Sequence, residues 1–434
     1  MPNEHITLRQ ELTNRKFKIP NRLFYAIYKL VMVNFEVDKH RPKIHYIDDP
    51  RKEKGAAIVL WNHLSRLDHA YILKTFYPRR FNMVAAYNEF FRSHLHWAFK
   101  QMSILPKKNF CLDVAGVKAI LSIIKQGGVV SMAPEGLATI TGQNEAIIPG
   151  CGHLLKHCKV PVYFAKFQGE ALVAPVFSEH YRKRGQSEVT IYKMFTPEQI
   201  KELSEEEIER RLNEEMNHDD YAYQKEHRFV WDTDGHGCEG MEDICYRCPS
   251  CGEEFRMHSE GDDLTCDACG YHVHCNEYLE LVPDKDTGKG IVYPTDWARW
   301  ERKTIIDEIR ANPDYSFSFH CKIGTQPEDG LVKGKDKSTE IVGEGTFAVD
   351  HQGIHFKGTK NGKPYSLDLS YEQFYRPIPG VNTKGFALYV EKSEYTEFLP
   401  EEPVVGKVYL LIPEMARLHT NAYPPLTGDL PLYE

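Results

Sequence analysis

The sequence contains no run of about 18 uncharged apolar residues, so no membrane-spanning helix is expected. Residues 1–18 lack an apolar core, and a secretory signal is therefore not expected either. The composition has no strong bias: 41% of the residues are hydrophobic and 27% are charged. These values exclude a chain that is disordered, collagen-like or a coiled coil throughout. The 434 residues are enough for about three domains.

Cysteine is scarce outside one segment, because seven of the eleven cysteines lie between Cys238 and Cys275. Without a secretory signal, we expect a cytoplasmic location, where the thiols stay reduced. The cluster therefore indicates metal ligands or free thiols rather than disulfides.

The net charge of −8 conceals an asymmetry along the chain. Residues 1–110 carry 20 Lys and Arg against 9 Asp and Glu, so the N-terminal part is basic and the remainder is acidic. This distribution favours an anionic partner for the N-terminal part, either lipid headgroups, phosphates or nucleic acid.

A helix is predicted from residue 21 to about residue 38, because apolar residues recur there at helical spacing. The apolar positions are Leu23, Phe24, Ile27, Leu30, Val31 and Phe35, and the flanking cations are Arg15, Lys16, Lys18 and Arg22. Two interpretations stay open: an amphipathic helix on a membrane surface, or a helix packed on its own domain.

From residue 56 to 196 strands and helices alternate, which predicts an α/β domain with one sandwiched sheet, extending over residues 1–235. The expected strands are 56–61, 82–86, 129–132, 160–165, 172–177 and 189–195. One helix is expected after Leu67, and two more are expected over 90–102 and 114–126. A charge-rich helix is expected over 197–228.

Two copies of a Cys-x-x-Cys-Gly motif, formed by Cys248, Cys251, Cys266 and Cys269, predict a zinc ribbon within residues 240–290. Four thiolates complete a tetrahedral site, so a structural Zn²⁺ is expected. Cys245 is also correctly spaced from Cys248, which leaves the ligand register open. The segment from Glu239 to Glu280 is strongly acidic and disfavours nucleic acid as a partner.

Residues 291–434 form a β-rich C-terminal region with hairpin turns at 351–353 and 360–362, an expected strand at 408–412 and a short terminal helix. Hairpins followed by a terminal helix resemble a pleckstrin-homology (PH) or GRAM-type domain. Such modules bind lipids or proteins, and the alternative is a domain that only braces its neighbour.

The first expected strand ends in a segment, residues 61–68, that carries His63 and Asp68. Five positions do not bring two residues together on a regular helix, so the two can pair only if His63 lies on the strand-to-helix turn. Asp68 would then orient one ring nitrogen and leave the other as a base. With 20 histidines in the chain, the spacing also arises by chance, and His258 with Asp263 is such a pair.

Other polar groups follow neighbouring strands of the same domain. Glu135 and Gly136 stand in a turn after residues 129–132, and Lys107 and Lys108 follow Pro106. Together with His63 these residue types are those of a site for a phosphate-bearing substrate.

These blocks resemble the glycerolipid acyltransferase family, whose members acylate lysophosphatidate and related acceptors. Residues 62–68 are similar to the family's His-four-residues-Asp block, and 134–136 are similar to its Pro-Glu-Gly block. Residues 89–106 and 160–162 resemble the remaining two blocks, in the family's order. The resemblance covers about residues 23–228.

The resemblance implies that His63 removes the proton of an acceptor hydroxyl while Asp68 holds the imidazole. It implies acyl-CoA or acyl carrier protein as donor, and a lysophospholipid as acceptor, first of all 1-acylglycerol-3-phosphate, which gives phosphatidic acid. The enzyme would lie peripherally on the inner face of the membrane. The residues assigned to substrate binding are Asn62, Lys107, Lys108, Glu135 and Gly136.

Two departures from the family pattern keep alternatives open. Leu137 and Ala138 replace the Thr or Ser and the Arg that usually follow Pro-Glu-Gly, and lysines stand where the family often has a phosphate-binding arginine. Lysine lacks the bidentate fork of arginine. The alternatives are an acyltransferase for another lyso-lipid or hydroxyl acceptor, and a lipid-binding scaffold without catalysis.

Overall fold

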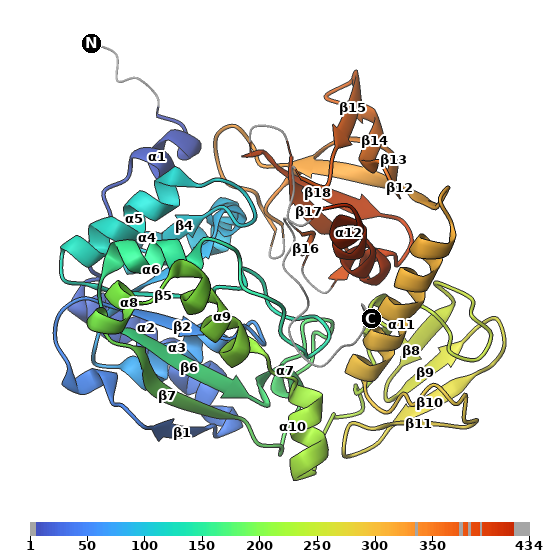
Figure 1. Cartoon of the computed structure of the whole chain (residues 1–434), viewed down its shortest axis with the longest axis horizontal. Coiled ribbons are helices and arrows are strands. Elements are labelled where there is room, and N and C mark those ends of the chain that lie inside the picture. Colours follow the sequence, from blue (N-terminus) through green and yellow to red (C-terminus); the bar gives the residue numbers. More distant parts are fainter. Residues whose placement is uncertain (1–5, 335–336, 373–375, 381–382, 391–392, 421–434) are drawn as a thin grey trace.

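The computed structural model describes residues 6–334, 337–372, 376–380, 383–390 and 393–420. Three parts follow one another along the chain, each built on its own sheet (Figure 1). An α/β part comes first, a small four-stranded part follows, and a β-rich part ends the chain.

The first sheet has seven strands in the order β1-β7-β6-β2-β5-β3-β4. Neighbouring strands are parallel except for β6 and β7, which are antiparallel. The strands are β1 (Lys43–Tyr46), β2 (Ala57–Trp61), β3 (Phe81–Ala86), β4 (Leu105–Lys107), β5 (Val129–Met132), β6 (Val162–Gln168) and β7 (Glu188–Phe195). The carboxyl ends of β2, β5, β3 and β4 therefore lie along one edge of the sheet, where open α/β sheets place their sites.

Both faces of this sheet are covered, as the wholly apolar strand β2 requires. Val59 and Trp61 belong to one core, and Ile58 and Leu60 belong to the other. Helices α2 (Arg22–Met32) and α3 (Asp68–Phe76) pack on the first core, whereas α5 (Val114–Lys125), α6 (Cys151–Cys158), α8 (Pro197–Glu202) and α9 (Glu205–Met216) pack on the second. The other helices of this part are α1 (Leu8–Asn14), α4 (Ser93–Met102), α7 (Glu170–Val173) and α10 (Asp220–His227).

Helix α2 continues as a π-helical segment (Val33–Val37) and a 3₁₀ turn (Asp38–His40). Tyr25 on its inner face is buried, while Leu23 on its outer face is 71% exposed. Throughout the described residues, every helix is too short or too polar to traverse a bilayer.

Two expectations for this part are wrong. The apolar run 172–177 is not a strand, because its beginning lies in the short helix α7 (Glu170–Val173) and the rest has no regular structure. The charged stretch 197–228 forms three helices rather than one, since Ser204 and Asp219 each cap a new N-terminus with their side chains.

The second part is a four-stranded antiparallel sheet of β8 (Met257–Glu260), β9 (Asp263–Cys266), β10 (His272–Cys275) and β11 (Leu281–Pro283). Helix α11 (Pro294–Ala311) leads into the third part, a seven-stranded antiparallel sheet in the order β15-β14-β13-β12-β18-β17-β16. Its strands are β12 (Ser316–Thr325), β13 (Glu340–Asp350), β14 (Gly353–Lys360), β15 (Lys363–Leu369), β16 (Ile378–Pro379), β17 (Phe386–Tyr389) and β18 (Tyr395–Pro400).

The strand expected at 408–412 is wrong, because these residues lie inside helix α12 (Val405–His419). Every residue from Val405 to Ala416 is buried, so the helix is covered on all sides and shows no polar face. A short apolar run of this kind does not distinguish a buried helix from a buried strand.

Ion pairs join α11 to the loop that follows β5. Arg302 of α11 lies 2.8 Å from Glu145 of that loop and 3.8 Å from Glu414 of α12. Burial alone would raise the pKa of Glu145, but Arg302 and two further arginines lower it to about 2. The first and third parts are thus connected by a buried charge network that holds the loop beyond β5 in place.

We expect Arg302→Met to lower the free energy of unfolding by about 3–5 kcal/mol, because it leaves the buried carboxylate of Glu145 without its hydrogen-bonded cation. Urea denaturation followed by tryptophan fluorescence measures this change. The matched control is Lys303→Met, which removes an exposed pair with Asp307 on the same helix and should alter stability little. Equal effects of the two substitutions would contradict a structural role for the network.

Candidate active site

The turn after β2 is anchored by the side chain of Asn62. Its Nδ2 donates to the carbonyl of Phe167 at 2.9 Å, and its Oδ1 accepts from the N–H of Phe167 at 2.7 Å. Since Phe167 lies on the neighbouring strand β6, the side chain extends the β2–β6 ladder by one step. The side chain of Asn62 is fully buried. In the structure it fixes the point at which the chain leaves the sheet.

Asp68, the first residue of α3, organises the turn between Asn62 and the helix. Its Oδ2 accepts from Nδ1 of His63 at 2.8 Å and from the N–H of Leu64 at 2.8 Å. Its Oδ1 accepts from the N–H and the Oγ of Ser65, each at 3.1 Å. The carboxylate is buried; its hydrogen bonds stabilise the turn before α3 and the histidine ring, and its negative charge is favourable at the N-terminus of the helix.

His63 is the reactive group that this turn presents. Because Nδ1 donates to Asp68, the neutral ring keeps its lone pair on Nε2, which has no hydrogen-bond partner among the described residues. The side chain is 29% exposed and can be reached from outside. Burial lowers the pKa of His63, but the hydrogen bond and charge of Asp68, with a contribution from Glu135, raise it above its usual value overall. Such a ring, oriented by a carboxylate, can act as a general base.

Glu135 lies in the turn after β5 and holds the backbone of His63. Its Oε1 accepts from the N–H of His63 at 2.7 Å, and its Oε2 accepts from the N–H of Glu145 at 3.0 Å. Asn144 donates its amide to both oxygens. Burial raises the pKa of Glu135 to about 7, against the effect of these donors. Glu135 is buried and accepts the N–H of His63, so in the structure it positions His63.

Gly136 completes the turn with φ at +79°, where a side chain is disfavoured. A Cβ there would also lie 2.5 Å from the side chain of Ile148. Its carbonyl accepts from Nδ2 of Asn109 at 2.5 Å, which joins the loop after β4 to the Pro-Glu-Gly turn.

The two predicted phosphate-binding lysines lie at the same sheet edge, but at a distance from His63. Strand β4 is three positions from β2, which corresponds to about 14 Å at the usual strand spacing. The Nζ of Lys107 donates to the carbonyl of Lys108 and lies 3.8 Å from Asp113, while the Nζ of Lys108 donates to the carbonyl of Ser393. Burial lowers the pKa of Lys107, and the charge of Asp113 counteracts this only in part.

A cavity of about 1040 Å³ opens beside these lysines. Its lining includes Lys108, Asp113, Tyr87, Ser393 and residues 12–18. Neither His63 nor Lys107 is part of this lining. The structure thus brings together His63, Asp68, Glu135 and Gly136, and places Lys108 in a separate pocket.

Three residues of the site had no role in the sequence interpretation. Ser65 binds Asp68 and also approaches Glu170, with 3.4 Å between its Oγ and Oε1 of Glu170. Burial, followed by the charge of Asp68, raises the pKa of Glu170 well above its usual value. Ser65 could have been noticed as a capping-type residue three positions before Asp68, whereas Asn144 and Glu170 carry no local signal.

The histidine–aspartate pair taken as a chance occurrence does not form a second site of this kind. Asp263 accepts from His272 and His274 across the sheet rather than from His258. The two residue pairs have the same spacing and differ in their place in the fold. His63 and Asp68 lie on a strand-to-helix turn, whereas His258 and Asp263 lie on β-strands.

The four cysteines of the repeated motif converge in the second part. Sγ of Cys248 lies 3.7 Å from Sγ of Cys269, and Sγ of Cys251 lies 3.8 Å from Sγ of Cys266. Four sulfurs at about 2.3 Å from one Zn²⁺ in a tetrahedron lie about 3.8 Å from each other, so the spacing fits that ion. Cys245 is buried and is not part of this group.

A second cluster of metal-ligand types, His180, His236 and Glu239, fits one ion less well. The two histidine rings are stacked 3.7 Å apart with an angle of 7° between their planes. Their lone pairs lie in separate parallel planes, so no ion can lie in the plane of both rings. Glu239 binds both rings directly.

We expect a histidine titration by NMR to place the pKa of His63 above the ordinary value of about 6.5. Asp68→Asn removes the group that raises it, so burial should then lower the pKa of His63. The control is Glu170→Gln, which changes a carboxyl behind Asp68 without touching the ring and should leave the titration in place. If the pKa of His63 were the same in the Asp68→Asn variant as in the wild-type protein, the pairing of His63 with Asp68 would be contradicted.

Comparison with known proteins finds a family match for this part of the chain. Residues 41–165 match the model of the Acyltransferase family. Among solved structures, the chain is similar to the 1-acyl-sn-glycerophosphate (LPA) acyltransferase PlsC from Thermotoga maritima, with 16% identity and a TM-score of 0.35 over 44% of this chain and 85% of that one. No curated protein matches. The stretch that contains His63, Asp68 and Glu135 is therefore similar to the Acyltransferase family.

Proposed function

We propose that the protein transfers a fatty acyl group from a thioester to the hydroxyl of a lysophospholipid. The observation that carries the proposal is the bond between Nδ1 of His63 and the buried carboxylate of Asp68, which leaves Nε2 without a partner among the described residues. This pair lies within the stretch that matches the Acyltransferase family. The carboxyl edge of a parallel sheet is also the usual place for such a site.

In the proposed reaction Nε2 of His63 takes the proton of the acceptor hydroxyl as its oxygen attacks the thioester carbonyl. The carbon–sulfur bond then breaks, and the proton on the imidazole passes to the departing thiolate. Asp68 stabilises the ring while it is charged. Only the neutral ring can begin the reaction, so the rate should fall as the pH decreases through the raised pKa of His63.

The proposed donor is acyl-CoA or acyl carrier protein, and the proposed acceptor is 1-acylglycerol-3-phosphate, giving phosphatidic acid. Lys107 and Lys108, at the carboxyl end of β4, support an acidic acceptor, because Asn109 connects their loop to the turn after β5 that holds His63. The neutral residues Leu137 and Ala138 favour a test with several lyso-lipids, since no cation follows Gly136 directly.

We expect His63→Ala to lower acyl transfer by about two to four orders of magnitude, because the hydroxyl loses its general base. Release of free thiol from acyl-CoA and from acyl carrier protein, measured with a panel of lyso-acceptors, tests this. Glu170→Gln serves as a control for a change close to Asp68, and it should retain activity because glutamine has the same shape and Glu170 contacts Ser65 rather than the ring of His63.

Product formation at the wild-type rate by His63→Ala would end the catalytic assignment. Absence of transfer by the wild-type protein, together with binding of lysophospholipid, would favour the non-catalytic lipid-binding scaffold instead.

We also propose that Cys248, Cys251, Cys266 and Cys269 hold a structural Zn²⁺ and that the second part is a zinc ribbon. The fit of the sulfur–sulfur distances to a tetrahedron supports this. The glycines after each Cys-x-x-Cys pair, Gly252 and Gly270, have positive φ angles of +82° and +73°. Such angles close the tight turn that brings backbone N–H groups toward the thiolates. Four protein ligands leave no open position for substrate, so the ion would stabilise the fold.

We expect the purified protein to contain one Zn²⁺ per chain by elemental analysis, and Cys251→Ser to lose it. Cobalt substitution gives a second readout, because thiolate ligands produce strong charge-transfer absorption. Cys245→Ser is the matched control and should keep both the metal and the absorption. Metal loss in the control, with retention in Cys251→Ser, would shift the ligand register to Cys245.

We propose that helix α2 lies on the cytoplasmic face of a membrane. Its outer surface, called here the α2 apolar face, consists of Leu23, Ile27, Leu30 and Val31, continued by Phe35. Trp97 of α4 lies next to this face, against Phe24. Cations surround it in sequence, as expected of an interfacial helix that contacts anionic lipid.

For the third part we propose a PH- or GRAM-like module. A seven-stranded antiparallel sheet followed by the buried helix α12 supports this assignment. The ion pairs of Arg302 with Glu145 and Glu414 favour a bracing role on the acyltransferase-like part.

A further inference from the structure

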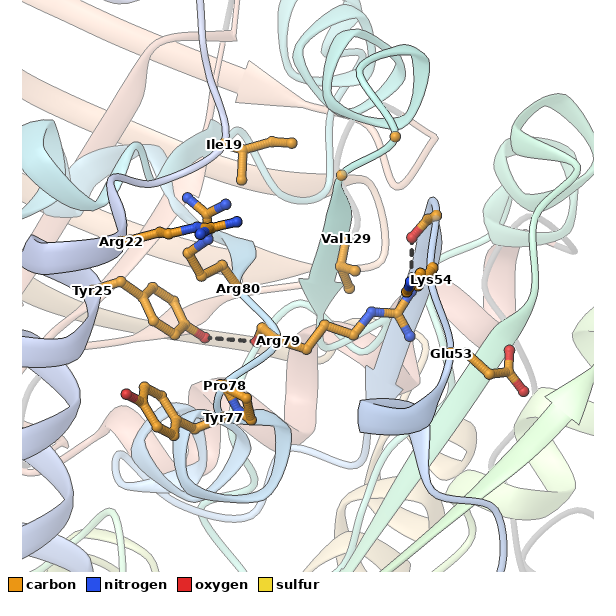
Figure 2. Close-up of a pocket in the computed structure, with 13 residues that line it drawn as sticks. Ile19, Arg22, Tyr25, Glu53, Lys54, Tyr77, Pro78, Arg79, Arg80 and Val129 are labelled. Atoms are coloured by element: carbon orange, nitrogen blue, oxygen red, sulfur yellow. Dashed lines mark hydrogen bonds between the residues drawn. The ribbon is translucent and has the colours of Figure 1, made fainter.

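A second cavity, of about 640 Å³, lies at the amino ends of the central strands (Figure 2). It is lined by Gly55 before β2, Arg80 before β3 and Gly128 before β5. His63 follows the other end of β2, and five residues of strand correspond to about 17 Å. The cavity is therefore separate from the proposed catalytic edge. We call it the amino-edge cavity.

Four cationic side chains line the amino-edge cavity: Arg22, Lys54, Arg79 and Arg80. Arg22 and Lys54 form no ion pair or hydrogen bond with any residue that the structure describes, and both are exposed. Arg80 uses one amino group to donate to the carbonyl of Pro20. Figure 2 shows Arg22 and Arg80 on the same side of the cavity.

Arg79 forms the floor of the amino-edge cavity and is held by backbone carbonyls. It donates to Pro50 at 2.7 Å and to Gly55 at 2.8 Å, while its own carbonyl accepts from the hydroxyl of Tyr25. Burial lowers the pKa of Arg79, and the charges of Tyr163 and Glu53 counteract this only in part. A buried or partly buried cation of this kind is stabilised by an anion from outside.

The one carboxylate in the lining, Glu53, offsets part of the charge of Arg79 but forms its ion pair with Lys193, outside the cavity. Its Oε1 pairs with Nζ of Lys193 at 2.5 Å, and this bond lowers the pKa of Glu53. In Figure 2 the carboxylate of Glu53 points away from Arg22 and Arg80. The cavity thus combines an excess of positive charge with unused guanidinium donors, which are suited to phosphate oxygens.

The position of the amino-edge cavity relates it to the α2 apolar face. Arg22 is the first residue of α2 and lines the cavity, and Leu23 beside it begins the α2 apolar face. A lipid whose chains cover Leu23 and Ile27 would therefore place its head group close to Arg22. Free phosphate has the same charge chemistry but gains nothing from the apolar face.

We propose that the amino-edge cavity binds the phosphate of an anionic membrane phospholipid, as a docking site distinct from the catalytic edge. This rests on the proposed contact between α2 and the membrane, but not on the acyl transfer. The lipid bound here is not a substrate, because its head group is held at the opposite end of the strands from His63. The site would orient the enzyme on anionic bilayers.

The test compares the full-length protein with an Arg22→Glu/Lys54→Glu variant. Both side chains are exposed and unpaired within the described residues, so the substitutions should preserve the fold. The matched control is Lys225→Glu/Lys285→Glu, which makes the same change in charge at exposed positions elsewhere. Cosedimentation is measured with vesicles of phosphatidylcholine alone and with vesicles that also contain phosphatidate.

We expect the Arg22→Glu/Lys54→Glu variant to bind the phosphatidate vesicles at least about tenfold more weakly than wild type. The control pair should bind like wild type, and binding to neutral vesicles should be the same for all three proteins. Inorganic phosphate should compete with the vesicles only weakly, at matched ionic strength.

Equal weakening by both variants would overturn the proposal, since it would indicate general surface charge rather than a site. Wild-type binding by the cavity variant would overturn it as well. Tight binding of inorganic phosphate without any preference for phosphatidate vesicles would replace the lipid with a soluble phosphate ligand. Acyl transfer to a soluble short-chain acceptor, measured in parallel, keeps the proposals separate: its absence in all proteins refutes the proposed function and leaves the docking site standing.

Discussion

The buried carboxylate of Asp68 is the group on which the candidate active site depends. It accepts four hydrogen bonds, from the ring of His63, from the N–H groups of Leu64 and Ser65, and from the hydroxyl of Ser65. One side chain therefore closes the turn before α3 and orients the imidazole. The side chain of Asp68 is only 1% exposed. Its buried charge is tolerated because donors of the same turn form hydrogen bonds with both carboxylate oxygens.

The position of that turn is set from both neighbouring strands of the sheet. On one side Asn62 binds the backbone of β6, and on the other Glu135 binds the N–H of His63 from the turn after β5. The loop beyond Glu135 continues to Glu145, whose backbone binds Glu135 and whose carboxylate binds Arg302 of α11. Packing of the C-terminal part is thus physically continuous with the geometry of the histidine.

Different functional groups lie at the two edges of the first sheet. The carboxyl edge carries His63 and, after β4, Lys107 and Lys108, while the amino edge carries the cationic cavity next to α2. The two groups of residues are separated by the length of the central strands, which is about 17 Å for the five residues of β2.

The sequence by itself determined the features that depend on local order. The apolar run of β2 and the repeated cysteine motif follow from residue types at fixed spacing, and the pairing of His63 with Asp68 follows from the spacing together with the apolar strand just before it. Tertiary structure alone decided the rest. Whether residues 408–412 form helix or strand depends on what surrounds them, and the structure buries them on every side of α12. Glu135, assigned to substrate from its motif, has its carboxylate on protein donors that lie 72 and 10 positions away. The cations of the amino-edge cavity come from separate segments, and only the parallel sheet, which aligns the starts of its strands, brings them together.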